Sequence, residues 1–381
     1  MAGLTIDRRD LLRLRFLRQG LGAAPGSRRR ASDVELLDYG VQDTGPDGAV
    51  WALLARGAPA FPGDELALAW TLRGAPHAYR RDELAAIAVA TAPYSEGDAA
   101  KRIFDASKAL NGAEIPVLDA LTVVADAERK IVSKPTIKGD LSSGLRAALD
   151  EPYLRWCNPC QAIHPYEMPF RLAALQAGLE LDAGTSPPVL RRIKGMKAPR
   201  FRRLAADALP HHDVIRNHLR FYPGARVHDV AEFVDAPLKD VRAHWPEDAV
   251  ELTVTGVGDG KKAGPRYVLA DDVDALSQVE PSDRVVLVGT YDPYLQLRDR
   301  ELLTTDADRR KALWPQIGRP GSILLDGEVL ATWRPKTAKG ALTVNVDPWK
   351  RVTAKQREQI EAEAERLAAF RRVDLAAVAY A

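Results

Sequence analysis

Leucines and a phenylalanine recur at helical spacing among arginines near the start of the chain, which predicts an amphipathic helix over residues 7–20. Two shorter helices are predicted at 33–39 and at about 47–56. Segment 65–79 is rich in apolar and aromatic residues on both sides of Gly74, a pattern typical of two short strands joined by a turn. Three helices followed by a hairpin indicate a winged helix over residues 1–80.

The same order of elements recurs twice, without a fixed sequence period. A second unit, residues 81–205, contains a basic turn at 134–139 within a helix-turn-helix and a possible wing at 153–164. A third unit, residues 206–280, ends in a hairpin whose tip is rich in glycine and lysine. The helices predicted in these two units lie at 82–91, 97–110, 116–132, 140–149, 166–177, 213–221, 227–234 and 236–245.

The pattern changes after residue 280. A strand is predicted at 285–289, a hairpin at 322–333 with Asp-Gly at its turn, a further strand at 342–346 and a charged amphipathic helix at 353–370. These elements indicate a β-rich C-terminal domain over residues 281–381. The expected fold class is therefore α+β, with three tandem winged helix-turn-helix units followed by a β-rich C-terminal domain.

Composition excludes several classes of protein. The chain has 381 residues, of which 46% are hydrophobic and 28% charged, as is typical of a soluble globular protein of two or three domains. No apolar run is long enough to span a bilayer, and the first ten residues lack the apolar core of a signal peptide. We therefore expect a cytoplasmic protein that is monomeric and has no membrane partner.

Basic residues are concentrated in a few segments, although the formal net charge is only +2. Segment 191–203 holds seven lysines and arginines and no acid, and such stripes suit local contacts with phosphates. A solvated surface is the simpler explanation for any one basic run. The candidate DNA contacts in these segments are Arg28, Arg29, Arg30, Lys134, Lys138, Arg191, Arg192, Lys194, Lys197, Arg200, Arg202, Arg203, Lys261 and Lys262.

An amide, a carboxylate and a hydroxyl stand in a row at Gln42, Asp43 and Thr44, between Gly40 and a Gly-Pro pair. A packed core does not need this sequence between a helix and an apolar run. One interpretation is a polar turn in which Asp43 or Thr44 caps a helix that begins near Asp47. The other is a functional site. Spacing alone favours the cap.

Four blocks of sequence resemble, in order, the AlkZ-like (YcaQ-type) winged-helix DNA glycosylases. Residues 40–46, Gly-Val-Gln-Asp-Thr-Gly-Pro, resemble the family's Gly-Leu-Gln-x-Gln motif, and residues 70–77, Trp-Thr-Leu-Arg-Gly-Ala-Pro-His, resemble its Trp-x-Met-Arg-Gly-Thr-Leu-His segment. Residues 291–300, Tyr-Asp-Pro-Tyr-Leu-Gln-Leu-Arg-Asp-Arg, are similar to its Phe-Asp-Pro-Leu-Leu and Arg-Asp-Arg, and residues 324–333 resemble a fourth block. The resemblance implies a bacterial protein in which winged helices and a β-rich domain surround double-stranded, damaged DNA.

The resemblance places the family's catalytic motif, Gln-x-Gln or Gln-x-Asp, at residues 42–44. Gln42 matches the first position, whereas Thr44 stands at the second and Asp43 is one residue out of register. Catalysis is therefore expected at Gln42, with Asp43 or Thr44 as the second polar group. The remaining residues expected at the DNA are Arg73, His77, Asp292, Arg298, Asp299 and Arg300. A structural role is the alternative for His77 and for the charged loop 292–300.

The reaction that the resemblance implies is hydrolysis of the N-glycosidic bond of an N7-alkylated or crosslinked purine. Such a base is cationic and leaves readily through a transition state that resembles an oxocarbenium ion, so that water is the only other reactant and no cofactor is expected. Gln42 has both an acceptor and donors with which to orient water. The alternative is a non-catalytic DNA-binding regulator or lesion sensor with a degenerate motif. A protein-interaction scaffold is a weaker third possibility.

Cys157 and Cys160 are the only cysteines, and His164 follows them. Structural zinc sites use four ligands, and the sequence has no second cysteine pair. A thioredoxin-like motif would need a strand-to-helix context that the pattern does not show. We therefore expect structural thiols and no metal, with a metal site and a redox site as the alternatives.

Overall fold

The computed structural model describes residues 4–59, 63–257 and 264–381. Its first part contains β1 (Leu4–Asp7), α1 (Arg8–Arg18), β2 (Val41–Gln42), α2 (Gly48–Ala55), β3 (Leu66–Trp70) and β4 (Pro76–Arg80). Asp7 caps α1 by accepting a hydrogen bond from the Arg9 N–H. The helix expected at 33–39 is instead two 3-10 turns, Ala31–Asp33 and Glu35–Asp38. The chain leaves the second turn at Gly40, whose φ of 96° ends helical structure.

The second part is mainly helical. Val124, Leu141, Leu145 and Phe170 form its buried core together with neighbours that include Trp70 and Leu190. The helix expected at 97–110 is divided in two, because the backbone leaves helical geometry at Ile103. The bounds are α3 (Leu84–Ala90), α4 (Glu96–Arg102), α5 (Ser107–Gly112), α6 (Val117–Ile131), β5 (Thr136–Ile137), α7 (Lys138–Ala148), β6 (Leu154–Cys157), β7 (Ala162–Pro165), α8 (Glu167–Gln176), β8 (Leu179–Leu181) and β9 (Val189–Arg192).

One six-stranded sheet joins these two parts of the chain. Its strand order is β2-β4-β3-β8-β9-β5, and Leu68 on β3 pairs with Leu181 on β8. The hairpin β3–β4 expected from the sequence is therefore not a free wing. The sheet crosses the boundary expected between residues 80 and 81, so the two parts are joined by backbone hydrogen bonds.

The third part matches the expected order of elements closely. It contains α9 (Val214–Phe221), α10 (Val227–Val234), α11 (Leu238–Ala243), β10 (Ala249–Thr255), β11 (Arg266–Leu269) and α12 (Val273–Leu276). β10 and β11 form the antiparallel hairpin, and β1 from the start of the chain adds to β10 in parallel. Lys261 and Lys262, expected at the tip of this hairpin, lie outside the described residues.

The C-terminal part is a five-stranded sheet in sequence order. It contains β12 (Val285–Val288), β13 (Gly321–Leu325), β14 (Glu328–Ala338), β15 (Ala341–Pro348) and β16 (Asp374–Tyr380), with α13 (Arg300–Leu303) and α14 (Ala307–Leu313) between the first two strands. α15 (Ala354–Arg371) covers the sheet and carries the chain back, so β16 pairs in parallel with β15. β16 was not expected from the sequence.

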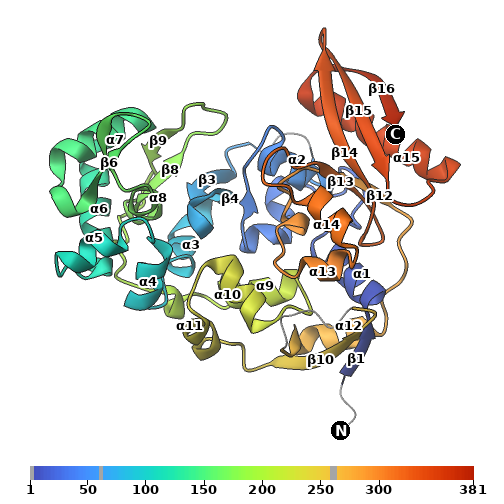
Figure 1. Ribbon diagram of the computed structural model, residues 1–381, viewed down its shortest axis with the longest axis horizontal. Helices are drawn as coiled ribbons and strands as arrows, with labels where there is room; N and C mark the ends of the chain where they lie inside the picture. Colours follow the sequence, from blue (N-terminus) through green and yellow to red (C-terminus); the bar gives the residue numbers. More distant parts are fainter. Residues whose placement is uncertain (1–3, 60–62, 258–263) are drawn as a thin grey trace.

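Figure 1 shows how these parts are arranged. The helices α5–α8 and the C-terminal sheet lie on opposite sides of α2, β3 and β4, and α9–α11 lie below them in this view. The fold is therefore mixed α+β with a β-rich C-terminal sheet. None of the helices in the described ranges is both long and apolar enough to cross a membrane.

Candidate active site at the Gln42 turn

The Gln42 turn begins where β2 ends against β4. Gln42 pairs with His77 in the sheet, and the Asp43 N–H donates to the Pro76 carbonyl at 2.8 Å. Gly40 permits this packing, because a Cβ atom there would lie 2.6 Å from the ring of Tyr79. The turn is thus held in place by backbone contacts on both sides.

Asp43 is a helix cap. Its Oδ1 accepts a hydrogen bond of 2.8 Å from the Ala49 N–H in the first turn of α2. Gly48 makes this possible, since a Cβ atom at that position would lie 2.2 Å from Asp43 Oδ1. The carboxylate is therefore engaged by the start of α2, and no hydrogen bond among the described residues joins it to Gln42.

Thr44 and Arg73 hold the side chain of Gln42. The Gln42 amide nitrogen donates to Thr44 Oγ1 at 3.0 Å, and Arg73 Nη2 donates to Gln42 Oε1 at 3.1 Å. These two contacts define which end of the amide is oxygen. The Thr44 hydroxyl keeps its own proton for donation, and Gln42 Oε1 keeps a second lone pair for accepting.

Arg73 is itself anchored by α10. Its Nη1 donates to the Phe233 carbonyl at 2.8 Å, and its guanidinium lies 4.1 Å from the centre of the Phe233 ring. Its backbone adopts a left-handed φ of 57°, which is uncommon for a residue with a side chain and is often found at functional sites. Burial lowers the pKa of Arg73, and the nearby charge of Arg298 lowers it further.

Buried aromatic side chains from α9 and α10 support this corner of the site. Tyr39 stacks on Phe233 with ring centres 5.4 Å apart, and its hydroxyl lies 2.7 Å from His218 Nδ1. Burial lowers the pKa of His218 to about 3, so this imidazole is neutral at physiological pH. The layer gives Arg73 a rigid apolar support.

His77 is also buried and neutral. Its Nδ1 donates to the Ala75 carbonyl at 2.9 Å and lies 3.1 Å from Thr71 Oγ1. Burial, and then the charge of Arg73, lowers the pKa of His77 to about 3. An imidazole with a 2% exposed surface and no charge is poorly suited to bind a phosphate, so the geometry favours the structural alternative for this residue.

Three arginines of the C-terminal part lie near the turn and form no salt bridge among the described residues, although the charge of Glu232 acts on one of them, Arg300. They are Arg298, Arg300 and Arg319, which we call the arginine group. Burial lowers the pKa of Arg300, and the charges of Arg319 and Arg298 lower it further, so both of these arginines are close enough to act on Arg300. Arg319 lies 5.7 Å from the ring centre of Tyr291, and a Cβ atom at Gly45 would lie 3.2 Å from that ring.

Arg319 was missed in the sequence because it stands in a Gly-Arg-Pro-Gly loop that resembles no motif. Thr44, Gly45 and Tyr291 line one small pocket. Tyr291 therefore lies between Arg319 of the arginine group and the Gln42 turn. Arg319 donates to the Pro315 carbonyl and Arg300 lies over the ring of Trp314, so neither charge is neutralised by a salt bridge. Neighbouring cations of this kind are a favourable arrangement for binding an anion.

Asp292 and Asp299 form buried ion pairs, which fits the structural alternative for this loop rather than a DNA-lining role. Asp292 accepts two hydrogen bonds of 2.8 Å from Arg56, and neither side chain of this pair is exposed. Asp299 binds Arg15 and Arg266. Burial would raise the pKa of Asp299, but the two arginines outweigh burial and hold the pKa at about 2. Both carboxylates are inside the protein, so they stabilise the fold and cannot contact DNA directly.

The expected basic contacts are divided between free and paired side chains. Pairing of β5 with β9 brings the segments around Lys134 and Arg191 together. Carboxylate partners are found for Arg30, Lys138, Arg191 and Arg200. Arg192 and Arg203 donate to backbone carbonyls. Exposed side chains for which the described residues provide no hydrogen-bond partner are Arg29, Lys134, Lys194, Lys197 and Arg202.

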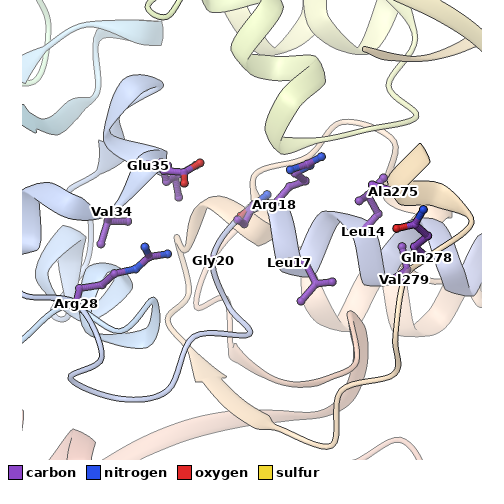
Figure 2. Close-up of a pocket in the computed structure, with 12 residues that line it drawn as sticks. Leu14, Leu17, Arg18, Gly20, Arg28, Val34, Glu35, Ala275, Gln278 and Val279 are labelled. Carbon is purple, nitrogen blue, oxygen red and sulfur yellow. The ribbon is translucent and has the colours of Figure 1, made fainter. Parts of the chain in front are cut away.

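Arg28 lies in a different place. It lines a pocket of about 340 Å³ together with Arg18, Glu35 and residues of the segment after α12, as Figure 2 shows. Arg18 is paired with Asp272 and Glu35 with Arg220, whereas the Nε atoms of Arg18 and Arg28 are buried without a hydrogen-bond partner in the described part of the chain. No sequence pattern indicated this pocket.

A larger groove of about 620 Å³ lies next to the Gln42 turn. It is lined by residues of β3, the β8–β9 hairpin, the start of α2 and Phe370 of α15. Arg81 and Arg191 are its cationic residues. Asp43 and Gly45 also contribute to its wall, so the turn lies between this groove and the small pocket at Thr44.

Comparison with known proteins identifies the chain. A family model described as DNA glycosylase AlkZ-like matches residues 37–370. The solved structure of the DNA glycosylase AlkZ of Streptomyces sahachiroi is similar to the fold, with a TM-score of 0.70 over 99% of this chain and 100% of that chain at 18% sequence identity. No curated protein matches the sequence. The matched region contains both the Gln42 turn and the arginine group, and the chain therefore belongs to the AlkZ-like DNA glycosylase family.

Proposed function

We propose that this protein hydrolyses the N-glycosidic bond of N7-alkylated or crosslinked purines in double-stranded DNA, and that Gln42 is the catalytic residue. The observation that carries the proposal is the fixed orientation of the Gln42 amide between Thr44 and Arg73. A polar side chain held in this way is prepared to position a water molecule before the substrate arrives. The family assignment supports the reaction class.

The chemistry requires little from the protein. An N7-alkylated purine already carries a positive charge, so its departure needs no strong general acid, and the sugar develops charge as in glycoside hydrolysis. Water would donate to Gln42 Oε1 and receive a hydrogen bond from the Thr44 hydroxyl. Because both groups are uncharged, they orient the water without deprotonating it strongly. Such a site is suited to bases that leave readily and poorly suited to unmodified bases.

The arginine group supplies the electrostatic part of the proposal. Arg298, Arg300 and Arg319 would receive backbone phosphates next to the lesion, while exposed residues such as Lys134 and Lys194 would contact the duplex further away. We further propose that residues 1–80, 81–205 and 206–280 are three winged-helix units arranged around the DNA. The third unit supports this most directly, with three helices followed by the hairpin β10–β11.

Base release tests the proposal. Wild-type protein is incubated with duplexes that carry N7-methylguanine or a purine interstrand crosslink, and free base or abasic sites are quantified. We expect release above the spontaneous rate from at least one of these substrates. Release from neither would reject the proposed reaction for these lesions.

A non-catalytic lesion sensor is the second candidate. It is favoured by one observation, namely that Asp43 is engaged in capping α2 and leaves Gln42 without a carboxylate partner in the described structure. Lesion-dependent duplex binding without any base release would support this candidate. Neither binding at low salt nor release would reject both candidates.

Arg73 provides a test of positioning. Replacement of Arg73 with lysine keeps the charge but removes the fork that reaches the Phe233 carbonyl and Gln42 Oε1 together. We expect the single-turnover rate of base release to fall by about 10- to 100-fold, with duplex affinity changed by less than about twofold. Arg171→Lys is the matched control, since Arg171 donates to the neighbouring Gly74 carbonyl without contacting Gln42. Equal losses in the two variants would show that Arg73 has only a structural role.

Arg298 provides a test of phosphate binding. Replacement with glutamine is expected to weaken binding to all duplexes alike and to lower the slope of log affinity against log salt by about one. The control is Arg309→Gln, because Arg309 already donates to the Trp349 carbonyl. An unchanged salt slope for Arg298→Gln would show that Arg298 does not contact a DNA phosphate.

A further inference from the structure

The β6–β7 hairpin holds Cys157, Cys160 and His164 together. Arg155 pairs with His164 and Cys157 with Ala162, so Cys157 and His164 lie on the same face of this two-stranded sheet. Cys160 lies in the turn between the strands, where Gln161 has a φ of 50° and donates from its side chain to the Asn158 carbonyl at 2.7 Å. The turn therefore brings the second sulfur back toward the first.

The three side chains form a compact set of metal ligands. One ligand atom from each lies within 4.8 Å of the other two. Both cysteines are free thiols. His164 Nε2 is buried and has no hydrogen-bond partner in the described part of the chain. A buried imidazole nitrogen without a partner is unfavourable unless another group satisfies it.

We propose that the β6–β7 hairpin binds a zinc ion through Cys157, Cys160 and His164. Two thiolates and an imidazole are a donor set that zinc prefers. The fourth tetrahedral position would be taken by water, because the set contains three protein ligands. Binding would release the thiol protons of the two cysteines to solvent, and the proposal replaces the expectation of structural thiols without metal.

A metal would add to the few interactions that hold this hairpin, of which packing of β7 against α7 is one. A two-stranded sheet has little stability of its own, and within the described ranges β6 and β7 pair only with each other. Its outer face presents the cross-strand pair Trp156 and Ile163, which are 55% and 40% exposed, so this face buries little apolar surface. A metal that joins the turn to both strands would fix their register.

Two rival interpretations are less consistent with the contacts. A Cys157–Cys160 disulfide would leave His164 Nε2 buried and unpaired. A second potential metal cluster consists of Glu83, His211 and His212, but Glu83 already pairs with Arg80 at 3.0 Å. The hairpin cluster is therefore the stronger candidate of the two.

Metal content is the direct test. Protein purified without chelator should contain one zinc ion per chain, as measured by inductively coupled plasma mass spectrometry. After removal of zinc, addition of Co²⁺ alone should produce thiolate-to-cobalt absorption, and Zn²⁺ should displace it. Zinc should be lost from Cys157→Ser/Cys160→Ser and strongly reduced in His164→Ala. It should be retained in His211→Ala, which alters the other cluster.

A second test measures the chemical and proteolytic accessibility of the hairpin and does not require the metal content to be determined. Zinc should protect both thiols from a thiol reagent and slow tryptic cleavage after the exposed Arg155, and a chelator should reverse both effects. Loss of zinc and of protection from trypsin only in the hairpin variants, with loss of thiol protection in His164→Ala and unchanged circular dichroism, supports the site. Thiols that react equally with and without chelator, or a disulfide in freshly purified protein together with no cobalt absorption, would overturn it.

Discussion

Replacement of Gln42 with leucine is expected to slow the release of N7-methylguanine from duplex DNA by about 100-fold under single-turnover conditions. Leucine is comparable to glutamine in size but can neither accept from Arg73 nor donate to Thr44. Water would then have no fixed position beside the sugar. Duplex affinity should change little, since the proposed phosphate contacts belong to the arginine group.

Asp43→Asn is the informative companion of Gln42→Leu. Asparagine can still accept the hydrogen bond from the Ala49 N–H through its side-chain oxygen, so the start of α2 should be preserved. If Gln42 acts with Thr44, this variant should release base at nearly the wild-type rate. A rate lowered by about 100-fold or more would instead identify Asp43 as a general base. Wild-type activity in Gln42→Leu would show that the site lies elsewhere in the chain.

Replacement of Asp292 with asparagine is expected to lower the free energy of unfolding by about 3–5 kcal/mol. The pair with Arg56 is fully buried, and Arg56 also donates to the Ala52 carbonyl and to Gln19, so it cannot turn toward solvent. Removal of the negative charge leaves the guanidinium charge buried without compensation. Urea unfolding, followed by circular dichroism, measures the loss.

Asp308→Asn is the matched control for this stability measurement. Asp308 pairs with Lys311 at 3.2 Å, but its side chain is 91% exposed. Water screens such a pair, so the free energy of unfolding should change by no more than about 0.5 kcal/mol. A similar small change for Asp292→Asn would mean that the buried pair does not stabilise the fold.

Local patterns predicted much of the secondary structure but little of the tertiary pairing. The helices at 213–221 and 227–234 begin and end almost where their apolar spacing indicated. β1 and β16 were missed because each is short or rich in alanine, and their strand partners are far away in sequence. The shared sheet was missed for the same reason, since no property of Leu68 indicates that it pairs with Leu181.

In the candidate site, too, local features could be predicted from the sequence and long-range contacts could not. The turn chemistry of residues 40–46 indicated both a helix cap and a functional site, and the structure assigns the cap to Asp43 while it places Gln42 beside Thr44. The roles of Arg73 and Arg319 depend on contacts between segments that are distant in sequence. The buried role of Asp292 could not be chosen over the alternative from sequence, because its partner, Arg56, is 236 positions away and carries no motif.

Some strands pair with strands from another part of the chain, and this has a consequence for the design of fragments. A fragment that starts at residue 206 would lack β1 and expose an edge of β10, and a fragment that ends at residue 80 would expose an edge of β3. Unpaired N–H and C=O groups along such edges recruit strands from other chains. The winged-helix outline describes how the chain is patterned, but the cooperative folding blocks are larger, and isolated units should associate with one another rather than remain single.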